Sequence, residues 1–211
     1  MRKILVTGAL GQIGSELTMR LREVYGEDNV VASSKSAKDG QIELTETGLF
    51  EVVDVTNRQQ LAEAVQKHKI NTIIHLAAVL SAVGESNPDL AWDVNINGLY
   101  NVLEVARTEN CSVFTPSSIA AFGDSTPKDN TPQDTIQRPS TMYGVTKVAG
   151  ELLCDYYYHK FGVDTRGVRF PGLISYKTLP GGGTTDYAVH IYYEALRSKK
   201  YTSYIGPGTK M

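Results

Sequence analysis

The stretch Lys3-Ile4-Leu5-Val6-Thr7-Gly8-Ala9-Leu10-Gly11-Gln12-Ile13-Gly14 decides which fold we expect for this chain. An apolar run ends at Gly8, two further glycines follow at regular spacing, and apolar residues then recur at helical spacing as far as Gly26. A strand, a glycine turn and a helix in this order are typical of a dinucleotide-binding turn. In such a turn the backbone approaches a pyrophosphate, and the helix start offers free N–H groups. The alternative is a glycine turn with a purely structural role. We predict these cofactor-binding residues here: Gly8, Gly11, Gln12, Ile13 and Gly14.

The rest of the chain alternates between predicted strands and helices. Further strands are expected at Asn29–Ser33, Leu49–Val53, Ile70–His75, Ser112–Thr115 and Thr165–Phe170. Helices are expected over residues 57–68, 87–107, 141–160 and 186–197, and the polar segments 36–48 and 124–140 are expected to be loops. Strands alternating with helices predict an α/β fold, a doubly wound parallel sheet of the Rossmann type.

The overall composition argues against several kinds of protein. With 211 residues, the chain is long enough for one domain with a substantial core. A net charge of −2 gives no reason to expect nucleic acid or an anionic membrane surface as a partner, and no apolar run reaches membrane-spanning length. The first residues do not resemble a signal peptide. Neither the two cysteines, Cys111 and Cys154, nor the four histidines show metal-ligand spacing. We therefore expect a cytoplasmic protein with reduced cysteines and no metal site.

Small or polar residues follow several predicted strands. Open α/β sheets bind ligands beyond the carboxyl ends of their strands, so these residues are candidates for a common site. Asp54 either holds an adenine amino group or begins a turn, and Ser117-Ser118 places two hydroxyl groups at another strand end. The further cofactor-binding residues that we predict from this position are Asp54, Val55, Leu76, Ala77, Ala78, Pro171 and Leu173.

The position just beyond the second predicted strand bears on the choice of cofactor. A carboxylate is expected there, about 20 residues after the glycines, to bind the adenosine ribose hydroxyls. This chain has Ser34-Lys35-Ser36 instead. A serine can still hydrogen-bond a ribose, and a lysine favours a 2′-phosphate. The sequence therefore keeps Ser34 as a cofactor-binding residue and leaves NAD and NADP open.

Tyr143 and Lys147 are candidates for proton transfer. Their spacing places both on one face of a predicted helix, and an ammonium group beside a phenol favours the phenolate, which can accept a proton. The same spacing recurs at Tyr156 and Lys160, where a cluster of tyrosines indicates packing instead. Only the first pair lies near the strand ends. Asn95, on the preceding predicted helix, either caps or packs, or it orders the water beside Lys147.

The stretch Pro180-Gly181-Gly182-Gly183-Thr184-Thr185-Asp186 opens the last predicted helix. One interpretation is a flexible loop with an N-cap. The other is a substrate loop, because free N–H groups at a helix start suit a small carboxylate.

Together, the glycine turn, Asn95, Ser118, Tyr143 and Lys147 resemble the extended short-chain dehydrogenase/reductase superfamily. The interval between Ser118 and Tyr143 fits that superfamily and rejects Tyr156 as the base. Within it, the whole chain is similar to the short-chain, epimerase-like family of L-threonine 3-dehydrogenases. The stretches that carry this resemblance are Gly8–Leu17, Leu80–Glu85, Pro116–Gly123 and, most specifically, Pro171–Ser175 with Pro180–Tyr187.

The resemblance implies oxidation of the 3-hydroxyl of L-threonine by NAD+. The product is 2-amino-3-oxobutanoate, which leads to glycine or aminoacetone. Tyr143 would take the hydroxyl proton, and Lys147 would stabilise the phenolate and bind the nicotinamide ribose. Ser118 would hydrogen-bond the substrate oxygen, and Asn95 would complete the proton relay. The implied substrate-binding residues are Ser81, Ser117, Ser118, Tyr143, Gly183, Thr184 and Thr185. Relatives commonly dimerise through the helices that carry Asn95 and Tyr143, so we expect a homodimer.

Two features depart from the family pattern. Ser34 replaces the usual acid, and family members continue well beyond the stretch that corresponds to Met211. We therefore expect residues 1–175 to form the NAD(P)-binding Rossmann domain, and residues 176–211 to begin a C-terminal substrate-binding region that is otherwise truncated. Two alternatives stay open: a nucleotide-sugar epimerase or dehydratase, which shares the Ser-Tyr-Lys group, and a non-catalytic NAD(P)-binding module.

Overall fold

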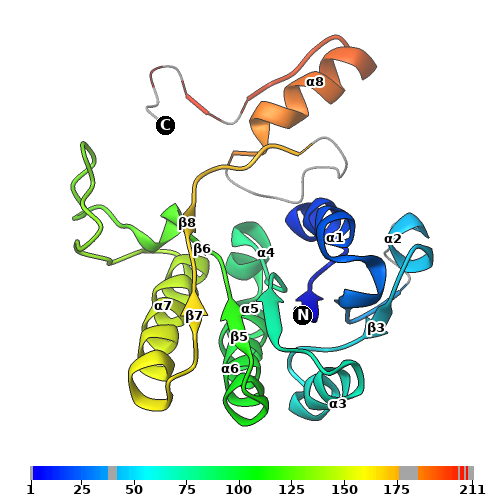
Figure 1. The fold of residues 1–211 in the computed structure, drawn as a ribbon. Coiled ribbons are helices and arrows are strands. Elements are labelled where there is room, and N and C mark those ends of the chain that lie inside the picture. Colours follow the sequence, from blue (N-terminus) through cyan, green and yellow to red (C-terminus); the bar gives the residue numbers. More distant parts are fainter. Residues whose placement is uncertain (1, 38–41, 176–184, 204, 207, 209–211) are drawn as a thin grey trace.

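A parallel β-sheet forms the centre of the computed structural model, which describes residues 2–37, 42–175, 185–203, 205–206 and 208 (Figure 1). Its strands lie in the order β3-β2-β1-β4-β5-β7, and each neighbouring pair is parallel. In chain order they are β1 (Ile4–Thr7), β2 (Val30–Ser34), β3 (Phe50–Val52), β4 (Thr72–His75), β5 (Ser112–Phe114) and β7 (Thr165–Arg166). The strand order reverses between β1 and β4, which confirms the predicted doubly wound sheet.

Helices cover both faces of this sheet (Figure 1). Ile4 and Val6 of β1 are buried on the face covered by α1 (Gln12–Tyr25) and α2 (Ile42–Glu46). Leu5 points the other way, because side chains alternate along a strand, and is buried with residues of the remaining main helices. These helices are α3 (Arg58–His68), α6 (Gly98–Glu109) and α7 (Met142–Phe161). The chain also contains the 3₁₀ turns η1 (Glu27–Asn29) and η3 (Ile119–Ala121), the short helix α4 (Ser81–Ser86) and the helix α8 (Tyr187–Arg197).

The predicted strand Thr165–Phe170 forms two short strands instead of one. After β7, the chain leaves the main sheet, and β8 (Arg169–Phe170) pairs in parallel with β6 (Ser117–Ser118). Gly167 lies at the break, and a Cβ there would lie 2.6 Å from the carbonyl oxygen of Thr115. This close approach of two backbones carries the β6–β8 sheet beyond the carboxyl edge of the main sheet.

The predicted helix 87–107 is interrupted. Asn87 caps its start as predicted, accepting a hydrogen bond of 3.1 Å from the amide of Leu90. α5 (Pro88–Trp92) then passes into a π-helical turn, η2 (Asp93–Asn97), before α6. Turns of the π type occur often at functional sites, and η2 carries Asn95.

Two other predictions were incomplete. The helix α2 lies within the expected loop 36–48, and the helix α4 was not expected.

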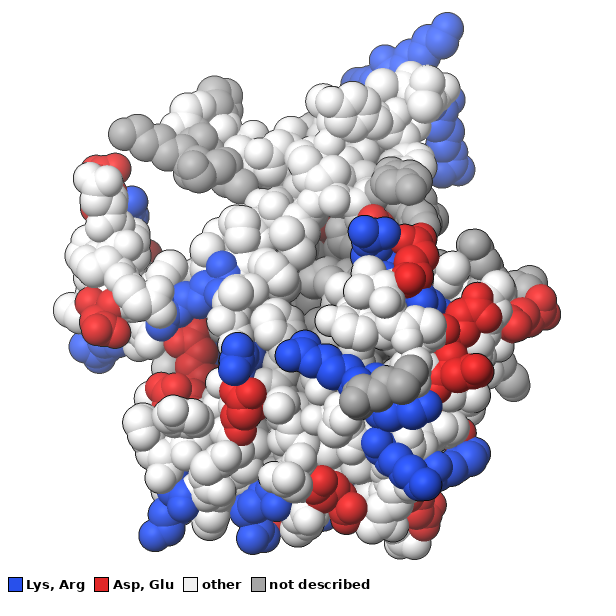
Figure 2. All heavy atoms as spheres, in the orientation of Figure 1, with Lys and Arg blue, Asp and Glu red and all other residues white. Residues whose placement is uncertain are grey.

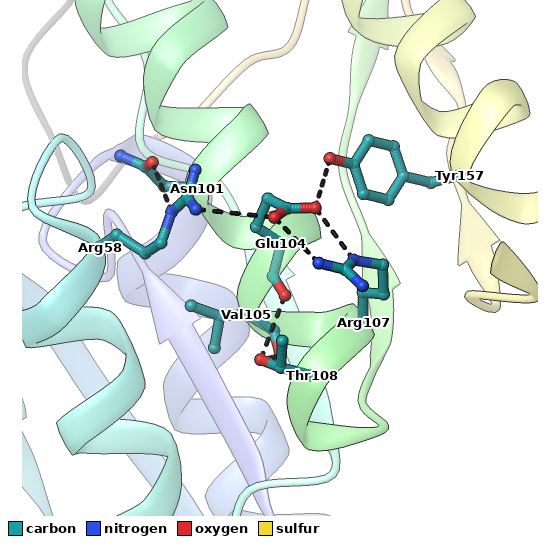
Figure 3. Close-up of polar contacts among 7 residues, drawn as sticks. All are labelled: Arg58, Asn101, Glu104, Val105, Arg107, Thr108 and Tyr157. Atoms are coloured by element: carbon teal, nitrogen blue, oxygen red, sulfur yellow. Dashed lines mark hydrogen bonds and ion pairs between the residues drawn. The ribbon is translucent and has the colours of Figure 1, made fainter.

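A polar cluster around Glu104 joins the outer helices (Figure 3). The carboxylate of this α6 residue accepts hydrogen bonds from Arg107, at 3.0 Å, and from the hydroxyl of Tyr157 on α7, at 2.8 Å. It also pairs with Arg58 of α3 at 3.5 Å. The hydrogen bond from Arg107 contributes most to holding the pKa of Glu104 below its usual range, so the carboxylate is ionised at neutral pH. Three helices are therefore linked through one charge.

Charged side chains of both signs are intermixed over the face drawn in Figure 2. Within the described part of the chain, no helix is long and apolar enough to cross a membrane. Among the same residues, no group of three or more His, Cys, Asp or Glu side chains is placed to hold a metal ion.

Candidate active site

The glycine turn between β1 and α1 has a backbone that only glycine can follow. Gly8 has a φ of +68°, and a Cβ at this position would lie 2.6 Å from the backbone nitrogen of Ala77. A Cβ on Gly14 would lie 2.2 Å from the carbonyl oxygen of Gly8. α1 begins after Gly11 without a side-chain cap on its first amide groups. This cradle, with a helix N-terminus behind it, fits the pyrophosphate of a dinucleotide.

Ser34 lies where the adenosine ribose is expected. The register pairs Thr7 of β1 with Ser33 of β2, so Ser34 stands level with the glycine turn. The next residue, Lys35, is exposed. Both residues are thus placed at the carboxyl edge of the sheet, beside the predicted cofactor cradle.

Asp54 has the turn role that was one of its two interpretations. Its carboxylate accepts hydrogen bonds from the amide and the hydroxyl of Thr56, at 2.9 and 2.8 Å. Val55 is buried against Gly98, where a Cβ would lie 2.8 Å from a Val55 methyl group. Contact of Asp54 and Val55 with an adenine stays a prediction.

The other predicted cofactor residues lie around the same edge. Leu76, Ala77 and Ala78 follow β4, and the amide of Leu76 donates to the carbonyl oxygen of Thr7 at 3.1 Å. Gln12 reaches across to the carbonyl oxygen of Leu173 at 3.5 Å. The fold therefore brings residues from the first and the last predicted cofactor stretches together.

The start of α7 is fixed by its cap and by close packing. The hydroxyl of Thr141 accepts a hydrogen bond of 3.0 Å from the amide of Gly144. A Cβ on Gly144 would lie 2.3 Å from the carbonyl oxygen of Ala120, so α7 presses on the segment that follows β6. Tyr143 and Lys147 consequently lie in the first turns of the helix, next to that segment.

Tyr143 and Lys147 lie together, but the ammonium group does not bond to the phenol. Lys147 Nζ lies 5.3 Å from the centre of the Tyr143 ring and donates to the carbonyl oxygen of Pro116 at 2.8 Å. Burial lowers the pKa of Lys147 to about 8, although the carboxylate of Glu151 acts in the opposite direction. Burial raises the pKa of Tyr143, and a hydrogen bond with Ser118 offsets part of this. The expected lowering of the Tyr143 pKa is therefore absent here, because desolvation outweighs the stabilisation of the phenolate.

The two serines of β6 face different partners. Ser118 lies close enough to Tyr143 to lower the pKa of its phenol, and the Ser118 oxygen accepts a hydrogen bond of 3.2 Å from the amide of Ala120. Ser117 donates a short hydrogen bond to the carboxylate of Glu151. The structure therefore brings Ser118, Tyr143 and Lys147 into one group, whereas the hydroxyl of Ser117 points to Glu151 of α7.

Asn95 is fully engaged by its neighbours. Its amide oxygen accepts from the backbone N–H of Val79 at 2.8 Å. Its amide nitrogen donates to the carbonyl oxygen of Val79 at 3.0 Å and to the hydroxyl of Thr146 at 3.1 Å. Asn95 thus ties the segment after β4 to the turn of α7 that carries Lys147. The packing role is confirmed, and the role in a proton relay stays a prediction.

A cleft of about 450 Å³ lies over the Ser-Tyr-Lys group. Its lining includes Gln12, Ser81, Ser118, Tyr143, Lys147, Leu173 and Thr185. Thr185 lies against Gly172, where a Cβ would come within 2.4 Å of its side chain. The predicted substrate residues Gly183 and Thr184 lie outside the described residues. The cleft therefore joins hydroxyl groups from α4, β6 and the segment before α8.

Tyr156, the alternative base, lies on the outer side of α7 with 52% of its surface exposed, as expected for the rejected pair.

Sequence reasoning missed the partners of the site residues. Glu151 and Arg169 were not considered, although Glu151 follows Lys147 by the same four-residue step and this spacing was a usable signal. His75 was considered only as part of a strand and as one of the histidines without metal-ligand spacing. It is buried, and its Nδ1 lies 2.8 Å from the hydroxyl of Thr7.

The glycine cradle and the doubly wound parallel sheet define a protein of the Rossmann type. The chain belongs to the NAD-dependent epimerase/dehydratase family, whose model matches residues 4–210.

Several individual proteins are similar to this chain over nearly its whole length. The chain is 60% identical to an uncharacterized epimerase/dehydratase of Staphylococcus haemolyticus, over all of this chain and 66% of that protein. The structure of L-threonine dehydrogenase from Clostridium difficile is 66% identical, with a TM-score of 0.93, over 98% of this chain and 64% of that one. L-threonine dehydrogenase from Phytophthora infestans is 52% identical, with a TM-score of 0.91, over 97% of this chain and 64% of that one. The chain thus spans about two thirds of the length of these relatives.

Proposed function

We propose that this chain carries the catalytic site of an L-threonine 3-dehydrogenase, which oxidises the 3-hydroxyl of L-threonine to 2-amino-3-oxobutanoate. The observation that carries the proposal is that Ser118, Tyr143 and Lys147 line one small cleft, in a chain 66% identical to a threonine dehydrogenase of known structure. The reaction would serve threonine catabolism to glycine or aminoacetone in the cytoplasm.

The residues of the cleft suit this reaction. The phenol oxygen of Tyr143 takes the proton of the substrate hydroxyl, and Ser118 hydrogen-bonds the same oxygen. Lys147 is buried beside the ring, where a cation favours the phenolate once substrate has displaced water. Ser81 and Thr185 line the same cleft, and we assign them to the amino and carboxylate ends of the substrate. A bound nicotinamide supplies the hydride acceptor for the substrate Cβ.

Residues of the edge beside the glycine turn would hold that cofactor. The pyrophosphate is assigned to the cradle at Gly8–Gly14, and the ribose to the end of β2 at Ser34. The proposed cofactor is NAD, as in the family as a whole. NADP is included in the assay because Ser34 and Lys35 stand where an acid is usual.

We also propose that the protein forms a homodimer through α6 and α7. Apolar side chains on the outer side of these helices are exposed, with Tyr100 at 42%, Leu152 at 62% and Tyr156 at 52%. The Glu104 cluster holds the two helices in a fixed relation, so the exposed side chains form a preformed surface. A second copy of the same face would cover them.

The deciding experiment measures reduction of NAD+ and of NADP+ with L-threonine and, in a separate assay of the sugar nucleotide itself, conversion of UDP-glucose. Reduction with threonine alone supports the proposal. Conversion of UDP-glucose would support the epimerase alternative, which uses the same Ser-Tyr-Lys group. Calorimetric binding of the cofactor without any turnover would instead support a non-catalytic module.

A further inference from the structure

Three residues of α7 meet three consecutive residues at the carboxyl edge of the sheet. Tyr143, Lys147 and Glu151 are spaced by four, so their side chains lie on one side of the helix. Tyr143 lines the cleft together with Ser118, Lys147 donates to the carbonyl oxygen of Pro116, and Glu151 accepts a hydrogen bond from the hydroxyl of Ser117. The first two contacts involve the proposed catalytic group. The third adds an acid that the proposed reaction does not use.

Glu151 is held by several donors at once. Arg169 donates from Nε at 2.9 Å and from Nη2 at 2.7 Å, and Gln137 donates at 2.9 Å. The side chains of Glu151 and Arg169 are only 22% and 19% exposed. Desolvation acts to raise the pKa of Glu151, but the hydrogen bonds from Arg169, Ser117 and Gln137 outweigh it and keep the pKa below its usual range. Glu151 is therefore a carboxylate at neutral pH, with both oxygens occupied.

Arg169 extends this contact to the second strand of the small sheet. β6 and β8 pair Ser117 with Arg169 and Ser118 with Phe170. The guanidinium of Arg169 also donates to the carbonyl oxygen of Gln133 at 2.9 Å. One carboxylate on α7 thus fastens both strands of the sheet that carries Ser118.

We propose that Glu151 is a positioning residue, which holds Ser117 and Arg169 so that the oxygen of Ser118 stays against the phenol of Tyr143. In this arrangement Ser117 acts through Glu151, and its only hydroxyl proton is used there. The inference rests on the proposed function, because positioning matters for catalysis only if Ser118 and Tyr143 react together. The competing interpretation is that Ser117 binds the substrate directly.

The test compares Ser117→Ala, Glu151→Gln and the double variant in steady-state kinetics with L-threonine. We expect each single change to lower kcat about tenfold, with KM and cofactor affinity within about twofold, and the double variant to resemble the singles. Ser117→Thr keeps the hydroxyl and should restore kcat. The matched control is Asp164→Asn, which breaks an equally forked but exposed Arg–carboxylate pair with Arg166 of β7, in the main sheet. It should leave kcat unchanged.

Unchanged kcat in folded Ser117→Ala and Glu151→Gln would overturn the inference. So would a raised KM in Ser117→Ala that adds to the effect of Glu151→Gln, since this marks a direct substrate contact. Loss of thermal stability alone, with normal kcat per folded molecule, would reduce Glu151 to a structural role.

A second readout needs no turnover. The amide of Ser117 donates to the carbonyl oxygen of Val168 at 2.8 Å, and the amide of Ala120 to Ser118 Oγ at 3.2 Å. Hydrogen exchange in residues 116–122 should therefore be faster in Glu151→Gln than in the wild type or Asp164→Asn. If the wild type oxidises no threonine, the proposed function fails, and the exchange rates alone decide the positioning role. Equal exchange in all three proteins would overturn it.

Discussion

The ammonium nitrogen of Lys147 lies 2.8 Å from the carbonyl oxygen of Pro116. Pro116 immediately precedes β6, so the lysine is bonded to the backbone that carries Ser118 and only lies beside Tyr143. The ammonium group lies 5.3 Å from the centre of the Tyr143 ring, and the side chain that lowers the pKa of the phenol is Ser118. Proton transfer, charge and backbone position are thus assigned to separate groups that can be tested one by one.

Replacing Tyr143 by Phe should abolish the base and spare the rest of the site. General acid–base groups contribute about 100-fold or more to rate, so kcat with threonine should fall by at least that factor. Cofactor affinity, measured by calorimetry, should stay within about twofold of the wild type. The matched control is Tyr156→Phe, an exposed tyrosine on the same helix with the same spacing to a lysine. A wild-type rate in Tyr143→Phe would exclude Tyr143 as the base.

The buried cation of Lys147 should make stability depend on pH. Its folded pKa of about 8 lies below the usual 10.5, so between these values the unfolded chain holds a proton that the folded chain has released. Stability therefore rises with pH across this window, relative to a variant without the group. We expect Lys147→Met to be more stable than the wild type at neutral pH by up to about 3 kcal/mol, with the difference closing near pH 10. Urea unfolding of both proteins across this range measures it. A difference independent of pH would contradict the burial argument.

Asn95 should be more important for stability than its neighbour Asn97. Asn95→Ala leaves the backbone N–H and carbonyl groups of Val79 without their partner and removes one of the two hydrogen bonds of Thr146, so it should lower the free energy of unfolding by about 3 kcal/mol. Asn97→Ala removes only an exposed bond of 2.9 Å to Asp93 and should cost less than about 0.5 kcal/mol. Denaturant unfolding gives both values. A fall in kcat of folded Asn95→Ala, beyond that of Thr146→Ala, would in addition support the proton-relay role.

The preference for NAD+ or NADP+ should depend on the side chains of Ser34 and Lys35 at the end of β2. Ser34→Asp places a carboxylate where the adenosine ribose is expected, and this should strengthen NAD+ binding and weaken NADP+ binding by about tenfold or more through charge repulsion. Lys35→Ala should weaken NADP+ alone. Dissociation constants for the two cofactors provide the measurement. Identical responses of NAD+ and NADP+ in both variants would place the ribose elsewhere.

The proposed dimer should depend on the outer side of α7. Leu152 is 62% exposed there, so Leu152→Glu buries no new charge in the monomer but places one in the proposed interface. Sedimentation should show a dimer for the wild type and a monomer for this variant. Ile191→Glu, on α8, is the control for loss of an exposed apolar side chain elsewhere. A monomeric wild type would exclude the dimer.

The sequence predicted those features that local rules determine. The glycine turn at Gly8–Gly14 follows from spacing alone, and Asn87 with Pro88 marked a helix start through the chemistry of a cap. The break at Gly167 was missed because it depends on the approach of Thr115, far away in the chain. The bond from Ser117 to Glu151 was missed for the same reason, since it forms only when β6 and α7 are packed.

For the Tyr143–Lys147 pair, the sequence predicted the position but not the pKa values. Its place beside the strand ends followed from topology. The raised pKa of Tyr143 did not, because it depends on how much water the folded cleft excludes, and sequence spacing contains no measure of burial.

The π turn at Asp93–Asn97 has a consequence for insertions and deletions. A turn closed by i→i+5 hydrogen bonds contains one residue more than an α turn. Deleting a single residue there would convert the turn to regular α geometry, leave the helix intact, and change which side chain occupies the place of Asn95. A change of length that is neutral for the helix would therefore be selected against through the site, so homologous chains with an active site should keep this segment at constant length.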